Sequence, residues 1–84
     1  MKYENFFVVK GIVKEIEECT EHLNYLNVNN ITVEIQNGYS CTRSINILNE
    51  KSIIIKAITV QFLNEMRQYY TLRIKELKIG LDKY

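Results

Sequence analysis

The stretch KSIIIKAITVQFLNEMRQYYTLRIKELKI, residues 51–79, decides the fold class of this chain, because it fits two different periodicities. If residues 51–63 and 69–79 are antiparallel strands, one register satisfies six cross-strand pairs, including one pair of opposite charge. In that register Val60 lies opposite Leu72. This pairing predicts a second β-hairpin in the C-terminal half of the chain.

The same stretch also fits an amphipathic helix. Plotted at 100° per residue, its apolar side chains gather on one arc of a helix over residues 64–79, and Gly80 stands where such a helix would stop. Aromatic and β-branched residues at Tyr69–Thr71 favour the strand, because they lose rotamer freedom within a helix. Residues 12–27 have a similar 4-3 spacing of apolar side chains. We expect strands, and keep helices over 64–79 and 12–27 as alternatives.

A first hairpin is predicted in the middle of the chain. Residues 31–35, ITVEI, alternate strictly between apolar and polar, and a turn sequence with Gly38 follows them. A three-residue loop with Gly38 in the left-handed conformation places Ile35 opposite Tyr39 and keeps one face apolar.

Three segments resemble strands of an OB-fold barrel. They are Val8–Ile16, similar to the long first strand with its internal glycine, and Ile54–Val60 and Tyr70–Leu77, similar to the fourth and fifth strands. The resemblance implies an all-β fold, a small antiparallel five-stranded barrel over one domain, residues 1–84. Its strands are expected near residues 5–18, 24–36, 39–48, 52–63 and 69–79. The usual helix of the fold would be missing, because only Leu48–Lys51 separate the third strand from the fourth.

Composition is that of an ordinary globular domain. Eleven Lys and Arg balance ten Asp and Glu, 46% of residues are hydrophobic and 25% are charged. These values exclude a disordered chain and a strongly basic nucleic-acid coat.

The first thirty residues contain no apolar run long enough for an export signal, so we expect a cytoplasmic protein with reduced cysteines and no membrane partner. The many Ile, Asn, Lys and Tyr residues have AT-rich codons, which suggests a low-GC microbe or its viruses and mobile elements.

Catalytic groups are scarce. His22 is the only histidine, and a thiolate-imidazole pair with Cys19 is the one arrangement for nucleophilic catalysis that the sequence offers. Cys19, His22 and Cys41 fall one ligand short of a structural zinc site. We therefore expect no enzyme activity, no metal and no cofactor.

Charge is distributed unevenly along the chain. The stretch 15–21 is acidic, whereas the last eighteen residues carry a net charge of +3. In the strand interpretation, cationic and aromatic side chains near the C-terminus share one face, as a surface for single-stranded nucleic acid would require for phosphate and base contacts. The candidate nucleic-acid-binding residues are Arg67, Tyr69, Arg73 and Lys75, with Arg43 and Tyr25 in support.

Two functions follow as expectations. The first is a small non-enzymatic accessory protein that binds single-stranded nucleic acid. The alternative is a protein-protein interaction module, or a regulator of a host protein encoded by a phage or mobile element, whose partner is another protein or a second copy of itself.

Overall fold

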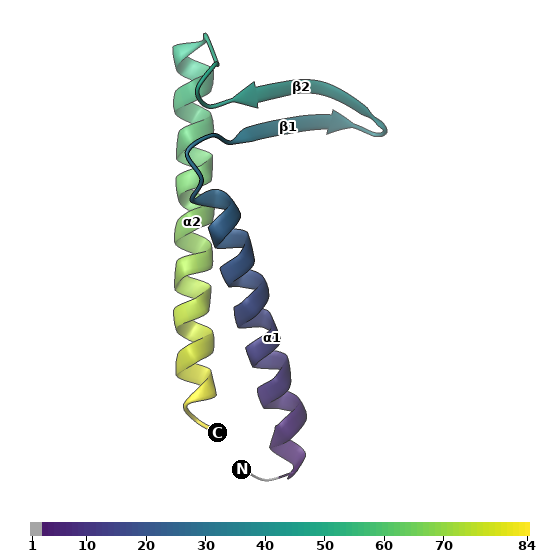
Figure 1. Cartoon of the computed structure of the whole chain (residues 1–84), viewed down its shortest axis with the longest axis vertical. Coiled ribbons are helices and arrows are strands. Elements are labelled where there is room, and N and C mark those ends of the chain that lie inside the picture. The colour runs from purple at the N-terminus through teal and green to yellow at the C-terminus, as the bar shows by residue number, and fades with distance from the viewer. Residues whose placement is uncertain (1–2) are drawn as a thin grey trace.

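Two helices and one β-hairpin make up the fold (Figure 1). Helix α1 (Tyr3–Leu26) and helix α2 (Ile53–Leu81) lie side by side and antiparallel, and the strands β1 (Thr32–Asn37) and β2 (Ser40–Asn46) stand between them in sequence. The computed structural model describes residues 3–84 and, among these, the side chains of residues 5–40 and 43–84. The fold class is therefore α+β.

The predicted OB-like barrel is wrong, and the resemblance on which it rested fails with it. The segment 8–16 lies inside α1, and the segments 54–60 and 70–77 lie inside α2. Only the second and third of the five expected strands overlap strands of the structure, namely β1 and β2. The helices kept as alternatives, over 12–27 and 64–79, lie along α1 and α2, which extend well beyond them.

The two helices pack through one face each, and both faces repeat every three or four residues. On α1 the partly or fully buried residues that follow this repeat are Asn5, Val9, Ile12, Ile16, Cys19, Leu23 and Leu26. On α2 they are Thr59, Leu63, Met66, Tyr70, Arg73, Leu77 and Leu81. A spacing of 3.5 residues keeps such a seam facing its partner helix along the whole contact.

Local signals define where α2 begins and how it tolerates β-branched residues. Ser52 has extended backbone angles, and its hydroxyl accepts a hydrogen bond from the backbone N–H of Ile55 at 3.3 Å, which caps the first turn. The hydroxyl of Thr59 donates to the carbonyl of Ile55 at 2.8 Å, so this buried polar group has its hydrogen-bond partner within the helix.

The hairpin has a different register from the predicted one. Asn37 pairs with Ser40, so that Gly38 and Tyr39 form a two-residue turn, and the register shifts between Ile35 and Gln36. The left-handed conformation predicted for Gly38 is confirmed, with φ at +65°. No other described residue has a positive φ, and a turn with this conformation at its first central residue alone is of type II′.

Asn46 fastens the hairpin to the rest of the chain. Its amide nitrogen donates to the side-chain oxygens of Asn30 at 2.7 Å and Thr32 at 2.9 Å. Its amide oxygen accepts from the backbone N–H groups of Leu48 and Asn49, both at 3.1 Å. One side chain therefore closes the turn that leads into α2 and joins the segments that enter and leave the hairpin.

The molecule is long and thin. Its extents are 56 × 26 × 16 Å, and the hairpin projects sideways from the helix pair at the end opposite to both termini (Figure 1). Among the described residues, the buried hydrophobic side chains are Cys19, Ile45, Leu63 and Leu77. A single layer of two helices has only one internal seam, so this core is small.

Candidate protein-interaction surface

Helix α2 extends far beyond the end of α1. The last residue of α1, Leu26, accepts hydrogen bonds from the guanidinium of Arg67, which marks the level at which α1 ends. Helix α2 begins fourteen residues earlier, at Ile53, so roughly 20 Å of it lies beyond α1. Within its own chain, no helix lies beside this part of α2; the segment that connects α1 to β1, the base of the hairpin and the turn that follows the hairpin lie there (Figure 1).

One side of this part of α2 is rich in isoleucine and exposed, whereas Thr59 and Leu63 in the same part are buried. Ile53 and Ile54 are 85% and 72% exposed, although they are among the most hydrophobic residue types. Ile58 and Phe62 follow on the next two turns and are each exposed to half or more of their surface.

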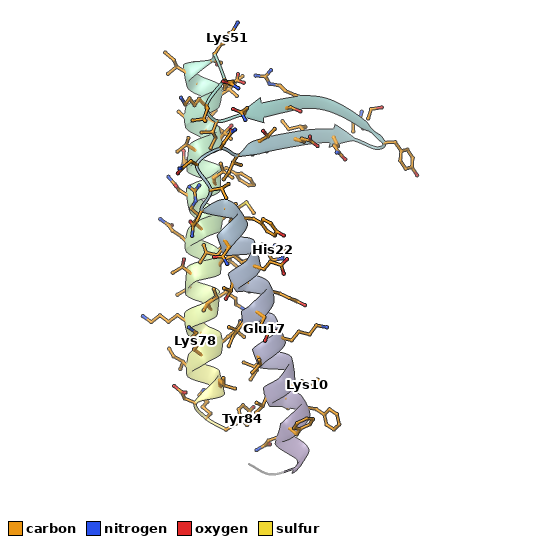
Figure 2. The ribbon with its side chains drawn as sticks, in the orientation of Figure 1. Lys10, Glu17, His22, Lys51, Lys78 and Tyr84 are labelled. Carbon is orange, nitrogen blue, oxygen red and sulfur yellow. The ribbon has the colours of Figure 1, made fainter. Side chains whose placement is uncertain are left out.

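Ile58 and Phe62 belong to a second apolar face along α2, which we name the outer stripe. Its members are Ile58, Phe62, Glu65, Tyr69, Leu72, Glu76 and Ile79, spaced alternately by four and three residues. Each of the five apolar members is at least half exposed. Because six of the seven stripe residues, all but Ile79, immediately precede a position of the buried α2 seam, the two faces are about 100° apart around the helix. Side chains along α2 project away from α1 as far as Lys78 (Figure 2).

Exposed aromatic side chains also occupy the start of α1. Phe6 and Phe7 are 47% and 65% exposed, and their rings meet edge to face with centroids 5.5 Å apart. Val8 and Val13 are exposed as well. The apolar surface that is left open therefore lies at both ends of the helix pair.

Two of the three arginines of the predicted nucleic-acid site, Arg67 and Arg73, are bound to protein groups of the other helix or their own. Nε and Nη2 of Arg67 donate to the Leu26 carbonyl at 2.9 and 2.6 Å, and Nη1 donates to Asn64 at 2.7 Å. Nε and Nη2 of Arg73 donate to one oxygen of Glu15 at 3.0 and 2.8 Å. These bonds, and the negative charge of Glu15, raise the pKa of Arg73 above its ordinary value.

The remaining predicted site residues are dispersed. Tyr69 belongs to the outer stripe and touches the ring of Tyr70 edge to face, and Lys75 is exposed on α2. Arg43 lies on the hairpin in an ion pair with Glu50, and Tyr25 lies near the end of α1 beside Glu21. The predicted face of alternating cations and rings does not exist, because a helix places residues two apart on different sides.

Cys19 and His22 have packing roles in this fold. Cys19 is a buried free thiol in the seam between the helices, and the ring of His22 stacks on that of Tyr70, with centroids 5.3 Å apart and planes 25° apart. The side chain of Cys41, the third expected metal ligand, lies outside the described residues. Among the side chains that are described, no three His, Cys, Asp or Glu residues form a group able to hold a metal ion.

Grooves on the surface are shallow and each is lined by a single helix. The one along the start of α2 has a volume of about 640 Å³ and is lined by α2 residues alone, from Ile53 to Gln68. Another of about 540 Å³ is lined by α1 alone, from Phe6 to Glu17. A small-molecule site normally encloses its ligand with several elements. These grooves instead have the form of helix surfaces that lack a neighbour.

Comparison with known proteins gives no relative: no family model, no curated protein and no solved structure matches the chain. Across the described part of the chain, no helix combines the length and the apolar character that crossing a membrane requires. The site therefore has to be judged on its own geometry, as an exposed apolar stripe on a helix.

Sequence reasoning missed the outer stripe, although the signal was present. On α2 the adjacent apolar pairs Phe62–Leu63 and Tyr69–Tyr70 lie seven residues apart, and midway between them and beyond them one residue of each adjacent pair is apolar, such as Met66 or Leu72. One member of each pair serves the seam and the other serves the stripe. Paired apolar residues at this spacing indicate a helix with two buried faces.

Proposed function

We propose that this chain is a protein-protein interaction module that docks an α-helix of a partner along the outer stripe of α2. The observation that carries the proposal is the 4-3 repeat from Ile58 to Ile79, in which five of the seven positions hold exposed apolar side chains. Helix-in-groove recognition uses this spacing, because it presents one side chain per turn to the partner. Exposed apolar surface of this extent on a small protein usually marks an interaction site.

The chemistry of the stripe supports a protein partner over nucleic acid. Its two charged members, Glu65 and Glu76, are acidic, and a phosphate backbone would repel them. The cations of Arg67 and Arg73, which a nucleic-acid surface would need, already bind Leu26 and Glu15. The same surface also suits a regulator that acts by docking on a host protein.

Site-specific photo-crosslinking tests the proposal. A photoreactive phenylalanine analogue replaces Leu72 of the outer stripe in one variant and Thr71, its exposed neighbour, in the control. These positions differ by about 100° around the helix. We expect a protein adduct from position 72 and none from position 71 when the variants are irradiated in the cells that make the protein. If position 72 gives no protein adduct, the proposal fails.

A further inference from the structure

The single chain leaves too much surface exposed for a folded protein of its mass. Its accessible surface is 6806 Å², whereas a compact monomer of 10.0 kDa has about 5,200 Å². The difference is about 1,600 Å² per chain. If two chains each buried this area, the interface would cover about 3,200 Å², which falls within the range of obligate homodimers.

The shape of the chain also indicates that it buries further surface against a second chain. The radius of gyration is 17.4 Å, against about 12 Å for a compact domain of 84 residues. The shortest extent is only 16 Å, because the two helices form a single layer. Stable domains bury the apolar face of one layer against a second layer. A second copy would supply that layer and complete a four-helix bundle.

The positions of the acidic residues in the outer stripe decide the direction of the partner helix. In a parallel pair of α2 helices, Glu65 and Glu76 would each face their own copies inside the interface, where like charges repel. An antiparallel pair centred near residue 67, the midpoint of α2, avoids both contacts. It places Phe62 opposite the partner's Leu72, and Glu65 opposite the partner's Tyr69.

The antiparallel pair also covers the two exposed ends. The start of α2, which has no helix beside it in its own chain, then lies along the partner's α2 and reaches the level where the partner's α1 begins. Val8 is 45% exposed and lies one heptad before Glu15, so the two side chains share one side of α1. The Glu15 carboxylate binds Arg73, which immediately follows the stripe residue Leu72. In the antiparallel pair the start of the other α2 would lie near the level of Val8.

Resting on the proposed function, we propose that the partner is a second copy of this chain. The outer stripes of two α2 helices pack antiparallel about a two-fold axis near residue 67, and the homodimer is a four-helix bundle with one hairpin at each end.

Sedimentation analysis of the purified chain tests the dimer. At about 10 µM we expect a mass of about 20 kDa, twice the 10.0 kDa of the chain. The variant Leu72→Glu places a charge in the stripe and should raise the dissociation constant at least tenfold. The control Thr71→Glu should keep the mass of the dimer. Any other mass for the wild-type chain, or a dimer unaffected by Leu72→Glu, overturns the proposal.

A second measurement covers the case in which Leu72→Glu fails to fold. For the wild-type dimer the melting temperature rises with protein concentration, because unfolding is coupled to dissociation. A melting temperature that is independent of concentration overturns the dimer, whatever the variant does.

Cysteine cross-linking tests the direction of the helices in a chain with Cys19→Ala and Cys41→Ser. Gln68→Cys lies near the two-fold axis and should form a disulfide-linked dimer. Ile54→Cys lies about 40 Å from its copy in the antiparallel pair and should therefore form no disulfide-linked dimer. Cross-linking at position 54 overturns the arrangement, since only a parallel pair brings those residues together.

Photo-crosslinking separates failure of the dimer from failure of the interaction function. An adduct from position 72 at twice the mass of the chain supports both proposals. An adduct with a different protein, together with a monomeric wild-type chain, overturns the homodimer and keeps the interaction module. No adduct overturns both.

Discussion

Arg67 of α2 binds the backbone carbonyl of Leu26, the last residue of α1, through two N–H groups at 2.9 and 2.6 Å. The last carbonyls of a helix have no partner inside it and lie at the negative end of its dipole. A guanidinium supplies both the donors and the positive charge. One side chain of α2 therefore stabilises the end of α1, forty-one residues away in the sequence.

Replacing Arg67 should weaken the contact between the helices. Arg67→Met keeps the length of the side chain but leaves the Leu26 carbonyl without these donors, and we expect the free energy of unfolding to fall by about 1.5–3 kcal/mol. Arg67→Lys keeps the charge near the helix end, so its free energy of unfolding should lie between those of the wild type and Arg67→Met. Urea denaturation at fixed protein concentration measures the free energy of unfolding of each variant. Lys75→Met, at an exposed position of the same helix, is the control. Equal stability of the Met variant and the wild type would mean that the contact contributes nothing.

Asn46 permits a finer test, because its two functions can be separated. Asn46→Asp keeps an oxygen for the N–H groups of Leu48 and Asn49 but loses the donors to Asn30 and Thr32. Asn46→Ala loses both sets. We expect a loss of about 1–3 kcal/mol for alanine and a smaller loss for aspartate. Thermal unfolding followed by circular dichroism ranks the two variants, and the reverse order would show that a carboxylate placed against the oxygens of Asn30 and Thr32 costs more than the two accepted bonds contribute.

The turn of the hairpin depends on Gly38. A type II′ turn needs a positive φ at its first central position, and a β-branched side chain resists this conformation. Gly38→Val should destabilise the hairpin by about 1–3 kcal/mol. Tyr39→Val is the matched control, because the adjacent turn residue has no positive φ and its side chain is fully exposed. Hydrogen exchange of the β2 amides is the readout. Similar exchange in both variants would contradict the turn assignment.

The sequence predicted the existence of the hairpin and the positive φ of Gly38 correctly, because alternation and turn chemistry are local signals, but the predicted loop length and register were wrong. The C-terminal half was misjudged for an identifiable reason. The hypothetical strand pair in residues 51–79 needed both strands to change phase together after a few residues. A repeat of 3.5 residues produces that change of phase when it is compared with a period of two. The phase change was therefore a sign of helix.

The functional surface was harder to predict than the fold. Which of the two apolar faces of α2 packs against α1 depends on the tertiary structure, since Tyr69 and Tyr70 are neighbours of the same residue type and only Tyr70 lies in the seam. The predicted cationic face assumed strand geometry, so it failed together with the strands. Charge along the chain was correctly described as uneven, but pairs such as Arg73 with Glu15 join the basic segment to the acidic one.

The ion pair between Arg73 and Glu15 should make a small contribution to stability, and salt should reduce this contribution. The side chains of Arg73 and Glu15 are 36% and 42% exposed, so solvent and counterions screen them. Glu15→Gln should lower the melting temperature slightly at about 0.05 M salt and less at about 1 M salt. Glu18→Gln, on the exposed side of α1, is the control. A decrease that persists unchanged at high salt would show that the glutamate acts through packing.

The contribution of the same ion pair to stability should depend on pH in a defined direction. Because Glu15 raises the pKa of Arg73, the folded state holds the Arg73 proton more tightly than the unfolded state. The stabilisation is complete below the ordinary pKa of arginine, and it is lost only as the pH rises through the raised value. Between about pH 7 and 10, Arg73→Met should therefore lower the melting temperature by a constant amount. A difference that changes across this range would assign the effect to another group.

Leu63 and Phe62 are neighbours in the sequence but serve different faces of α2. Leu63 is 2% exposed within the single chain, whereas Phe62 is half exposed and belongs to the outer stripe. Leu63→Ala should cost about 2–5 kcal/mol, because it leaves a cavity inside the chain, and should lower the melting temperature without dissociating the dimer at about 10 µM. Phe62→Ala should instead cause dissociation on dilution, because in the proposed dimer its contacts lie across the two-fold axis. Paired thermal unfolding and sedimentation of the two variants make the comparison. If both variants dissociate equally, or neither does, the division of α2 into an internal seam and an outer stripe is wrong.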